Sequence, residues 1–242
     1  GIWVISPKRL FTNNWQDELW LVAGGIFGGS LYFFTENTAL GITQASNVSF
    51  IICTAPLLTT ILSLLFYKSE KASKGLIYGS LLALMGVGLI VFNGSFVLKI
   101  SPIGDLLTLL AALSWAFYSL IIKKMAGRYP TIFITRKIFF YGVLTILPAF
   151  LLHPLHPDTA VLLQPAVLFN LLFLAVLASL ICYVLWNVVL KQLGTVRASN
   201  YIYLNPLVTM IASFLILDEK ITLVALGGAA CIVCGVYWAE KK

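Results

Sequence analysis

The sequence predicts an all-α protein whose helices cross a membrane several times. Apolar residues make up 60% of the 242 residues and charged residues only 10%, whereas a soluble domain carries roughly 25% charged residues. The mean hydropathy is correspondingly high, at +0.97. The apolar runs are continuous and do not alternate with a period of two, so they predict helices and not the strands of a membrane barrel.

Eight apolar runs are long enough to cross a bilayer, for which a helix needs about 17–25 residues. In chain order they are residues 19–40, 48–67, 75–92, 106–122, 138–152, 166–190, 201–217 and 221–238. The fifth run is the weakest, because Arg136 and Lys137 crowd its start and Pro148 lies inside it.

The basic residues predict how the helices are oriented, since lysine and arginine collect in cytoplasmic loops. With the N-terminus in the cytoplasm, Lys99 and Lys220 alone of the 16 lysine and arginine residues fall on the opposite side. We therefore predict that both chain ends are cytoplasmic. The net charge of +7 is then a signal of topology and not of nucleic-acid binding.

A set of residues occurs twice in the same order, which indicates an internal duplication. Pro56, Glu70, Lys71, Gly79 and Gly86 recur as Pro206, Glu219, Lys220, Gly228 and Gly235. The prolines are 150 residues apart (206 − 56), and the other pairs are 149 apart (for example 235 − 86). The offset covers five predicted helices, an odd number, so the second copy crosses the membrane in the opposite direction. Such inverted repeats are a common construction of secondary transporters.

The two copies define two predicted repeats, residues 1–98 and 99–242. The second repeat holds five predicted helices and the first only three. We therefore expect that the first repeat lacks its first two helices and that the intact protein has ten. The chain also begins with Gly1 and not with methionine, as expected of an N-terminally incomplete form.

In the first predicted helix, Tyr32 and Glu36 lie four residues apart and share a face, and Asn37 follows them. Glu36 is the only acidic residue inside a predicted span. A carboxylate within a membrane usually faces the bundle interior and marks a substrate or ion pathway. Because burial disfavours its charged form, we predict that Glu36 carries a coupling proton and that Tyr32 and Asn37 contact substrate. The alternative is a hydrated carboxylate at the outer mouth.

Pro56 in the second predicted helix and Pro206 in the seventh predict kinks at matching positions of the two repeats, because proline lacks the amide donor. Interrupted helices at matching positions are the best pointer in a sequence to a transport site. Asn200, Tyr203 and Asn205 flank the second kink, and we predict that they contact substrate. The alternative is that both kinks serve packing alone.

The fourth predicted helix carries Trp115 and Tyr118 on one face, and the sixth carries Trp186 and Asn187. An aromatic wall with a few polar tips suits a site for metabolites or amphipathic solutes. Trp115 lies well inside its span, too deep for an interfacial aromatic belt. We therefore predict that these four residues line a central substrate cavity.

Several segments resemble the EamA-like branch of the drug/metabolite transporter superfamily. They are residues 36–40, residues 45–47 leading to Pro56, residues 104–105 and 113–118, and the run from Pro206 through Glu219 to Gly228. The resemblance covers nearly the whole chain. It implies ten helices in two inverted halves, cytoplasmic termini, and export or exchange of small metabolites across a bacterial inner membrane without ATP.

The sequence carries no motif of an enzyme or an ATP-driven pump, since it contains no P-loop, no H-E-x-x-H and no G-x-S-x-G. Cys231 and Cys234 have metal-ligand spacing, but they lie in an apolar run without a second pair, which indicates packing. We expect no enzymatic activity, no cofactor and no metal.

The sequence thus predicts a secondary transporter that moves a small amino acid-like or amphipathic solute by alternating access, with protons as the expected coupling ion. Its expected surroundings are the lipid bilayer, as a monomer or homodimer, without nucleic acid. One alternative is a passive channel or facilitator, although a charged ring typical of channels is not evident. Another is a nucleotide-sugar carrier of the same superfamily, which would need basic residues inside the spans.

Overall fold

The fold was analysed in a computed structural model that describes residues 11–67, 73–92, 101–152, 159–217 and 221–241. Every regular element within these ranges is a helix. In chain order the elements are α2 (Trp15–Gly25), η1 (Ile26–Ser30), α3 (Leu31–Ile42), α4 (Ala45–Ile52), α5 (Ala55–Phe66), α6 (Lys74–Phe92), α7 (Pro102–Ala126), α8 (Thr131–Leu152), α9 (Thr159–Leu162), α10 (Pro165–Leu172), η2 (Phe173–Ile181), α11 (Cys182–Leu193), α12 (Thr195–Asn200), η3 (Tyr201–Leu204), α13 (Asn205–Leu217) and α14 (Leu223–Glu240).

Within the described ranges, six helices are long and apolar enough to cross a bilayer, so the chain is a multi-pass membrane protein. They are Asn47–Phe66, Lys74–Phe92, Pro102–Ala126, Thr131–Ala149, Pro165–Leu193 and Leu223–Glu240. Two further predicted spans, 19–40 and 201–217, are also helical but lie outside these six. The first contains Glu36 and four glycines, and the second is shortened by the 3₁₀ turn of η3.

Each proline that was predicted to kink a helix lies directly after a break. The α4 helix ends at Ile52, and Pro56 lies in the first turn of α5. In the second predicted repeat, α12 gives way to the 3₁₀ turn of η3, and Pro206 follows at the start of α13. Proline is well suited to a first helical turn, where its missing amide has no helical partner to lose.

Two helical runs contain a π-helical segment, η1 between α2 and α3 and η2 between α10 and α11. Adding the offset of 150 to residues 26–30 gives 176–180, which falls inside η2 at 173–181. A π-helical turn is rare and occurs frequently at functional sites. The two runs therefore share a local distortion at corresponding positions.

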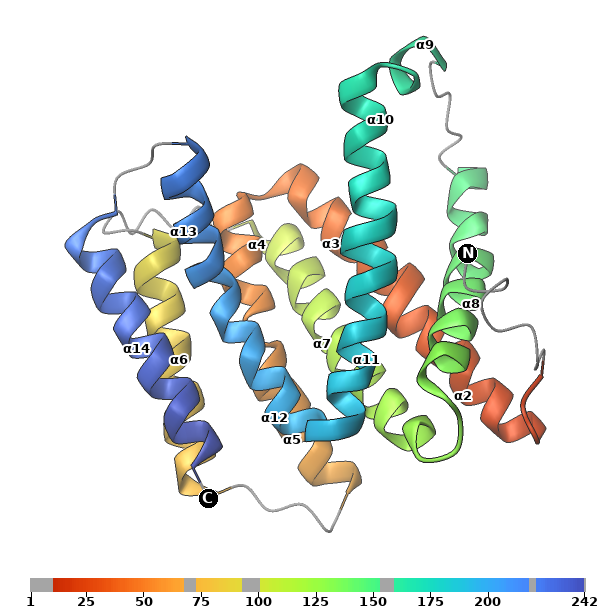
Figure 1. The fold of residues 1–242 in the computed structure, drawn as a ribbon, viewed down its shortest axis with the longest axis horizontal. Coiled ribbons are helices and arrows are strands. Elements are labelled where there is room, and N and C mark those ends of the chain that lie inside the picture. Colours follow the sequence, from red (N-terminus) through yellow and green to blue (C-terminus); the bar gives the residue numbers. More distant parts are fainter. Residues whose placement is uncertain (1–10, 68–72, 93–100, 153–158, 218–220, 242) are drawn as a thin grey trace.

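The helices α6 and α14 lie side by side (Figure 1). They pack against each other along their glycines. Gly79 faces the backbone of Gly235, and Gly86 faces the backbone of Gly228, so the two helices run antiparallel. A Cβ at any of these four positions would overlap the opposite helix. Small residues at this spacing allow the backbones to approach closely.

Two groups of buried side chains form the interior. One joins α2, α7, α8 and α11, and it includes Leu21, Tyr118, Ile138 and Tyr183. The other joins α6, α14 and η3 around Val87, Ile232 and Tyr203. The α7 helix contacts α2, α3, α4, α5, α11 and α12 and therefore occupies the middle of the bundle, as Figure 1 shows.

Candidate functional site

An aromatic cluster occupies the junction of α3, α7 and α11. The ring of Trp115 on α7 lies 5.1 Å from Tyr32, 5.7 Å from Tyr183 and 5.8 Å from Trp186, measured between centroids. Tyr118, one turn further along α7, lies 5.2 Å from Trp115 and 6.0 Å from Tyr183. The structure thus brings together four of the predicted site residues, Tyr32, Trp115, Tyr118 and Trp186, and adds Tyr183.

A chain of hydrogen bonds ties this cluster to α8. The Tyr118 hydroxyl donates to Oδ1 of Asn187 at 2.6 Å, and Nδ2 of Asn187 donates to the Thr135 hydroxyl at 2.9 Å. All three side chains are buried. Because their polar atoms are satisfied by one another, the chain holds α7, α8 and α11 in a fixed relative position.

The π-helical segment η1 packs directly against the cluster. The Tyr183 hydroxyl donates to the carbonyl oxygen of Gly28 at 2.7 Å. A Cβ at Gly28 would overlap the ring of Tyr118, so only glycine permits this approach. The distorted turn therefore supplies both a hydrogen-bond acceptor and the space for an aromatic ring.

Several polar groups of α7, α11 and α12 are buried and have no hydrogen-bond partner among the described residues. They are Nε1 of Trp115, Nε1 of Trp186, the hydroxyl of Ser114, and both side-chain polar atoms of Asn200. Trp115 and Trp186 both pack against a buried group of Ala55, Ala112 and Ile202, and Ile202 follows Asn200 closely in the chain. Buried polar groups normally have partners, so these unpaired donors and acceptors are the candidate contacts for a polar solute.

The carboxylate of Glu36 accepts a hydrogen bond from the Tyr32 hydroxyl at 3.0 Å, and Glu36 is half-buried. Since the Tyr32 ring contacts Trp115, Glu36 is joined to the aromatic cluster through one intermediate side chain. Asn37 differs from its counterpart Asn187. It is exposed and donates to the carbonyl oxygen of Phe33 in its own helix.

The remaining predicted contacts do not converge on the cluster. Tyr203 is buried, but it belongs to the second interior group, with Cys53 and Ile232. Asn205 is exposed at the start of α13. Asn200 is fully buried at the end of α12.

Two acidic residues of α2, Asp17 and Glu18, are buried and pair with basic residues that sequence reasoning placed on the cytoplasmic side. Glu18 pairs with Lys137 and accepts hydrogen bonds from Tyr141 and Thr12. Burial opposes ionisation of Glu18, but the hydrogen bonds from Lys137, Tyr141 and Thr12 lower its pKa to about 2.

A second ion pair is formed by the neighbouring residue, Asp17. Arg128 donates to Oδ1 of Asp17 at 2.6 Å, and the Tyr129 hydroxyl donates to Oδ2 at 2.8 Å. The signal in the sequence was the adjacent Asp17-Glu18 before one span and Arg136-Lys137 at the start of another. Hydropathy counts cannot show that such charges meet.

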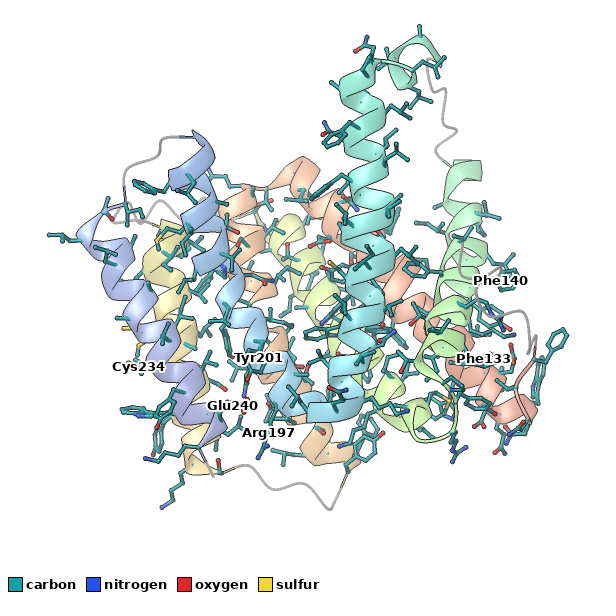
Figure 2. All side chains as sticks on the ribbon, viewed as in Figure 1. Phe133, Phe140, Arg197, Tyr201, Cys234 and Glu240 are labelled. Atoms are coloured by element: carbon teal, nitrogen blue, oxygen red, sulfur yellow. The ribbon has the colours of Figure 1, made fainter. Side chains whose placement is uncertain are left out.

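Pockets among the described residues open near the ends and sides of the bundle. One of about 320 Å³ lies between α5, α12 and α14 and includes Arg197 and Glu240, which Figure 2 labels at the same end of the bundle. Another of about 320 Å³ is lined by residues of η1, α3 and α8, among them Ser30, Phe34 and Thr145. The third, of about 400 Å³, lies between α2, the end of α5, and α7.

Comparison with known proteins identifies a family. The model of the EamA-like transporter family matches residues 1–92 and 102–239. An uncharacterized transporter of Archaeoglobus fulgidus is 28% identical over 99% of this chain and 82% of its own length. A probable amino-acid metabolite efflux pump of Salmonella typhimurium is 29% identical over 71% of this chain and 60% of its own length.

The fold is also found among solved structures. One crystal structure superposes with a TM-score of 0.78, at 19% sequence identity, over 94% of this chain and 77% of that one. At this level of identity the likeness concerns the fold.

Proposed function

Since the chain belongs to the EamA-like transporter family and is a membrane transporter and not an enzyme, we propose that it moves a small solute by alternating access without ATP. The expected location is a bacterial inner membrane, with both chain ends in the cytoplasm. This orientation is supported by the concentration of basic residues on one side of the predicted spans.

The observation that carries the proposal is the aromatic cluster of Tyr32, Trp115, Tyr118, Tyr183 and Trp186. It is built from α3 of the first proposed repeat and from α7 and α11 of the second. Its two buried indole N–H groups have no partner among the described residues. Aromatic faces with a few unpaired polar groups suit a solute that has both an apolar body and polar ends.

The inverted-repeat arrangement is supported by the packing of α6 on α14. At the 149-residue offset, Gly79 corresponds to Gly228 and Gly86 to Gly235. Gly79 faces the counterpart of Gly86, and Gly86 faces the counterpart of Gly79. Reciprocal contacts of this kind are what a two-fold axis produces. Because the two helices are antiparallel, the proposed axis lies in the membrane plane and relates residues 1–98 to residues 99–242.

Alternating access then follows from two halves that rock around a shared site. The breaks before Pro56 and Pro206 lie at matching positions of the two proposed halves. A broken helix can change its bend without losing hydrogen bonds along its whole length. These two breaks are the proposed hinges.

Glu36 is the proposed proton-coupling group. Its hydrogen bond to Tyr32 connects it to the ring of Trp115, so a change in its protonation alters the wall of the proposed site. A group of this kind would bind a proton from one side of the membrane and release it to the other, in exchange for solute.

The proposed substrate is an amino acid-like or amphipathic metabolite. This class fits the aromatic walls and the unpaired indole donors, and the name of the Salmonella typhimurium relative points to the same class. Among the other predicted contacts, Asn187 is proposed to position Tyr118, and Asn200 is proposed to offer its unpaired polar atoms to the solute. Tyr203, Asn205 and Asn37 stay predicted substrate contacts.

The proposal is tested in proteoliposomes with a panel of radiolabelled amino acids, beginning with phenylalanine. Glu36→Gln should reduce pH-gradient-driven flux at least tenfold and leave solute exchange at equal pH intact. Asp105→Asn is the matched control, because Asp105 is a half-buried carboxylate outside the aromatic cluster. If the pH-gradient-driven flux of Glu36→Gln equals that of the wild type, Glu36 is a structural or mouth-lining residue. A passive facilitator then becomes the better account.

A further inference from the structure

The pocket between α5, α12 and α14 lies where the two proposed repeats meet. The first repeat contributes Thr60, Leu64 and Leu76 to its lining, and the second contributes residues 193–197 and 239–241. Its volume of about 320 Å³ falls near the lower end of the range of about 300–1,000 Å³ that small-molecule sites occupy. The pocket therefore has the size of a site for one small solute.

The body of this pocket is aliphatic. Leu64, Leu76, Leu193 and Val196 line it, and its lining includes no aromatic side chain among the described residues. It differs in this respect from the aromatic cluster around Trp115. Apolar contacts with branched aliphatic side chains favour a solute whose own apolar part is aliphatic.

Charged groups of both signs share the same lining. Arg197 lies on α12 and Glu240 at the end of α14, and Figure 2 labels the two at the same end of the bundle. Neither forms an ion pair with the other or with another described residue. Oε1 of Glu240 is buried and also has no hydrogen-bond partner among these residues. Lys241 lines the pocket as well, but it is exposed.

A buried hydroxyl group in the lining is unpaired. The Thr60 hydroxyl donates to the carbonyl oxygen of Pro56 at 2.9 Å, and Oγ of Ser73 accepts from the backbone amide of Leu76 at 3.0 Å. Thr195 differs from both. It is completely buried, yet its Oγ1 has no hydrogen-bond partner among the described residues. Since buried hydroxyl groups normally have a partner, this hydroxyl is a candidate contact for a polar group of a bound solute.

From these groups we propose that the pocket binds a zwitterionic amino acid with an aliphatic side chain. The carboxylate of the ligand pairs with Arg197, whose guanidinium group can donate two parallel hydrogen bonds to it. The ammonium group pairs with Glu240, and the aliphatic side chain packs on the apolar body of the pocket. A simple anion would leave Glu240 without a partner, and a simple cation would leave Arg197 without one. A ligand with both charges uses both groups.

The role of this second site rests on the proposed function. Arg197 and Lys241 belong to the basic residues that the alternation of spans assigns to the cytoplasm, so the pocket lies on that side of the bundle. In a transporter it is the place where a solute binds before it reaches the aromatic cluster. Binding to the pocket needs no transport and is therefore measured on the purified chain.

The test is photolabelling of the purified chain with a diazirine analogue of leucine, followed by mass spectrometry of the labelled peptides. Label should appear within residues 193–197 or 239–241, and leucine should compete for it. Two analogues each lack one charge: 4-methylpentanoate has no amino group, and 3-methylbutylamine has no carboxylate. Each should compete at least about tenfold more weakly than leucine, the loss expected when one hydrogen bond to a charged group is missing.

Variants of the two charged residues test the same contacts from the side of the protein. Arg197→Gln and Glu240→Gln should each lower the labelling of the pocket about tenfold. Lys191→Gln is the matched control, since this exposed lysine on α11 does not line the pocket. The melting temperature of each variant without ligand reports whether it folds. If a variant does not fold, competition by the two analogues on the wild-type chain decides the question.

Three results would overturn the proposal. The first is the absence of label from the pocket. The second is competition by either analogue that equals competition by leucine, which would indicate a site for anions or for cations alone. The third is an equal loss of labelling in Lys191→Gln. Since the readout is the position of the label, none of these outcomes bears on whether the protein transports a solute, and a failure of transport would leave the binding result standing.

Discussion

At the scale of single residues, Tyr118 joins the aromatic cluster to the polar interior. Its hydroxyl donates to Asn187, which in turn donates to Thr135. Tyr118→Phe removes the first donor and leaves Oδ1 of Asn187 unpaired. We predict a loss of about 0.5–2 kcal/mol in the free energy of unfolding, the range for hydrogen bonds between membrane helices.

This loss is measured by reversible unfolding in mixed detergent micelles. Tyr78→Phe is the control, because Tyr78 is 64% exposed on α6 and its hydroxyl makes no hydrogen bond with a described residue. A double-mutant cycle with Thr135→Val should show that the two losses are coupled. Additive losses would mean that the hydrogen bonds do not form one chain.

The buried pair of Glu18 and Lys137 gives a second prediction at this scale. Lys137→Met removes the cation and leaves the Glu18 carboxylate buried without its partner. Breaking one member of a buried pair costs about 3–5 kcal/mol. Glu18→Gln/Lys137→Met should recover most of that loss, whereas Lys191→Met, at an exposed lysine, should change the free energy of unfolding little. Equal stability of the single and double variants would contradict the ion pair.

The same pair predicts a pH dependence. Because the pKa of Glu18 is lowered to about 2 in the folded protein, below an ordinary value of about 4, its ionised form stabilises the fold. This contribution is complete above the ordinary value and is lost as the pH falls toward 2. Unfolding measured at pH 6 and pH 3 should show a larger decline for the wild type than for Glu18→Gln.

The different surroundings of two corresponding asparagines could not be predicted from the sequence. Asn37 and Asn187 occupy corresponding positions, and nothing in the sequence around them predicts different roles. Asn187 is buried between α7 and α8, whereas Asn37 is exposed and bonded to its own helix. The two asparagines differ because different helices pack against them. Their positions in the sequence do not show which helices those are.

At the scale of helices, the close contact of α6 and α14 depends on glycine. An added Cβ at Gly79 would overlap the backbone of Gly235 and Ala239. Gly79→Ala should therefore force the helices apart and lower the free energy of unfolding by about 1–3 kcal/mol.

The matched control lies in the same helix pair. Gly227 on α14 has no atom within 4 Å of an added Cβ, so Gly227→Ala should be neutral or stabilising by up to about 1 kcal/mol. Chemical unfolding of both variants measures the difference. Similar destabilisation at the two positions would show that the effect is one of helix propensity and not of close packing.

Helix positions were largely predictable because each long apolar run has no strong competing structure in a bilayer. The predicted runs 75–92 and 221–238 correspond to α6 (Lys74–Phe92) and α14 (Leu223–Glu240). The π-helical segments were not predictable, because hydropathy does not distinguish one helical hydrogen-bond pattern from another. The break in the second span was expected at Pro56, but it lies at Cys53 and Thr54, since proline fits the first turn of the following helix.

At the scale of the whole molecule, the fold class, the membrane location and the family follow from composition and from a few recurring motifs. The six apolar helices within the described ranges and the family match support the same class. The composition of the site was partly predictable, because aromatic and amide side chains are rare enough in apolar helices to stand out. Their convergence was not, since it depends on how α3, α7 and α11 are rotated about their axes.

The central claim, transport by alternating access, is tested most directly by counterflow. Proteoliposomes containing the chain are preloaded with unlabelled phenylalanine or another solute of the panel, and the uptake of the same labelled solute is followed at equal pH on both sides. A carrier returns faster to the outer side when it is loaded, so preloaded vesicles should take up label faster than empty ones and show a transient overshoot. Identical initial uptake without an overshoot, in vesicles that do conduct the solute, would contradict alternating access and indicate a passive pore.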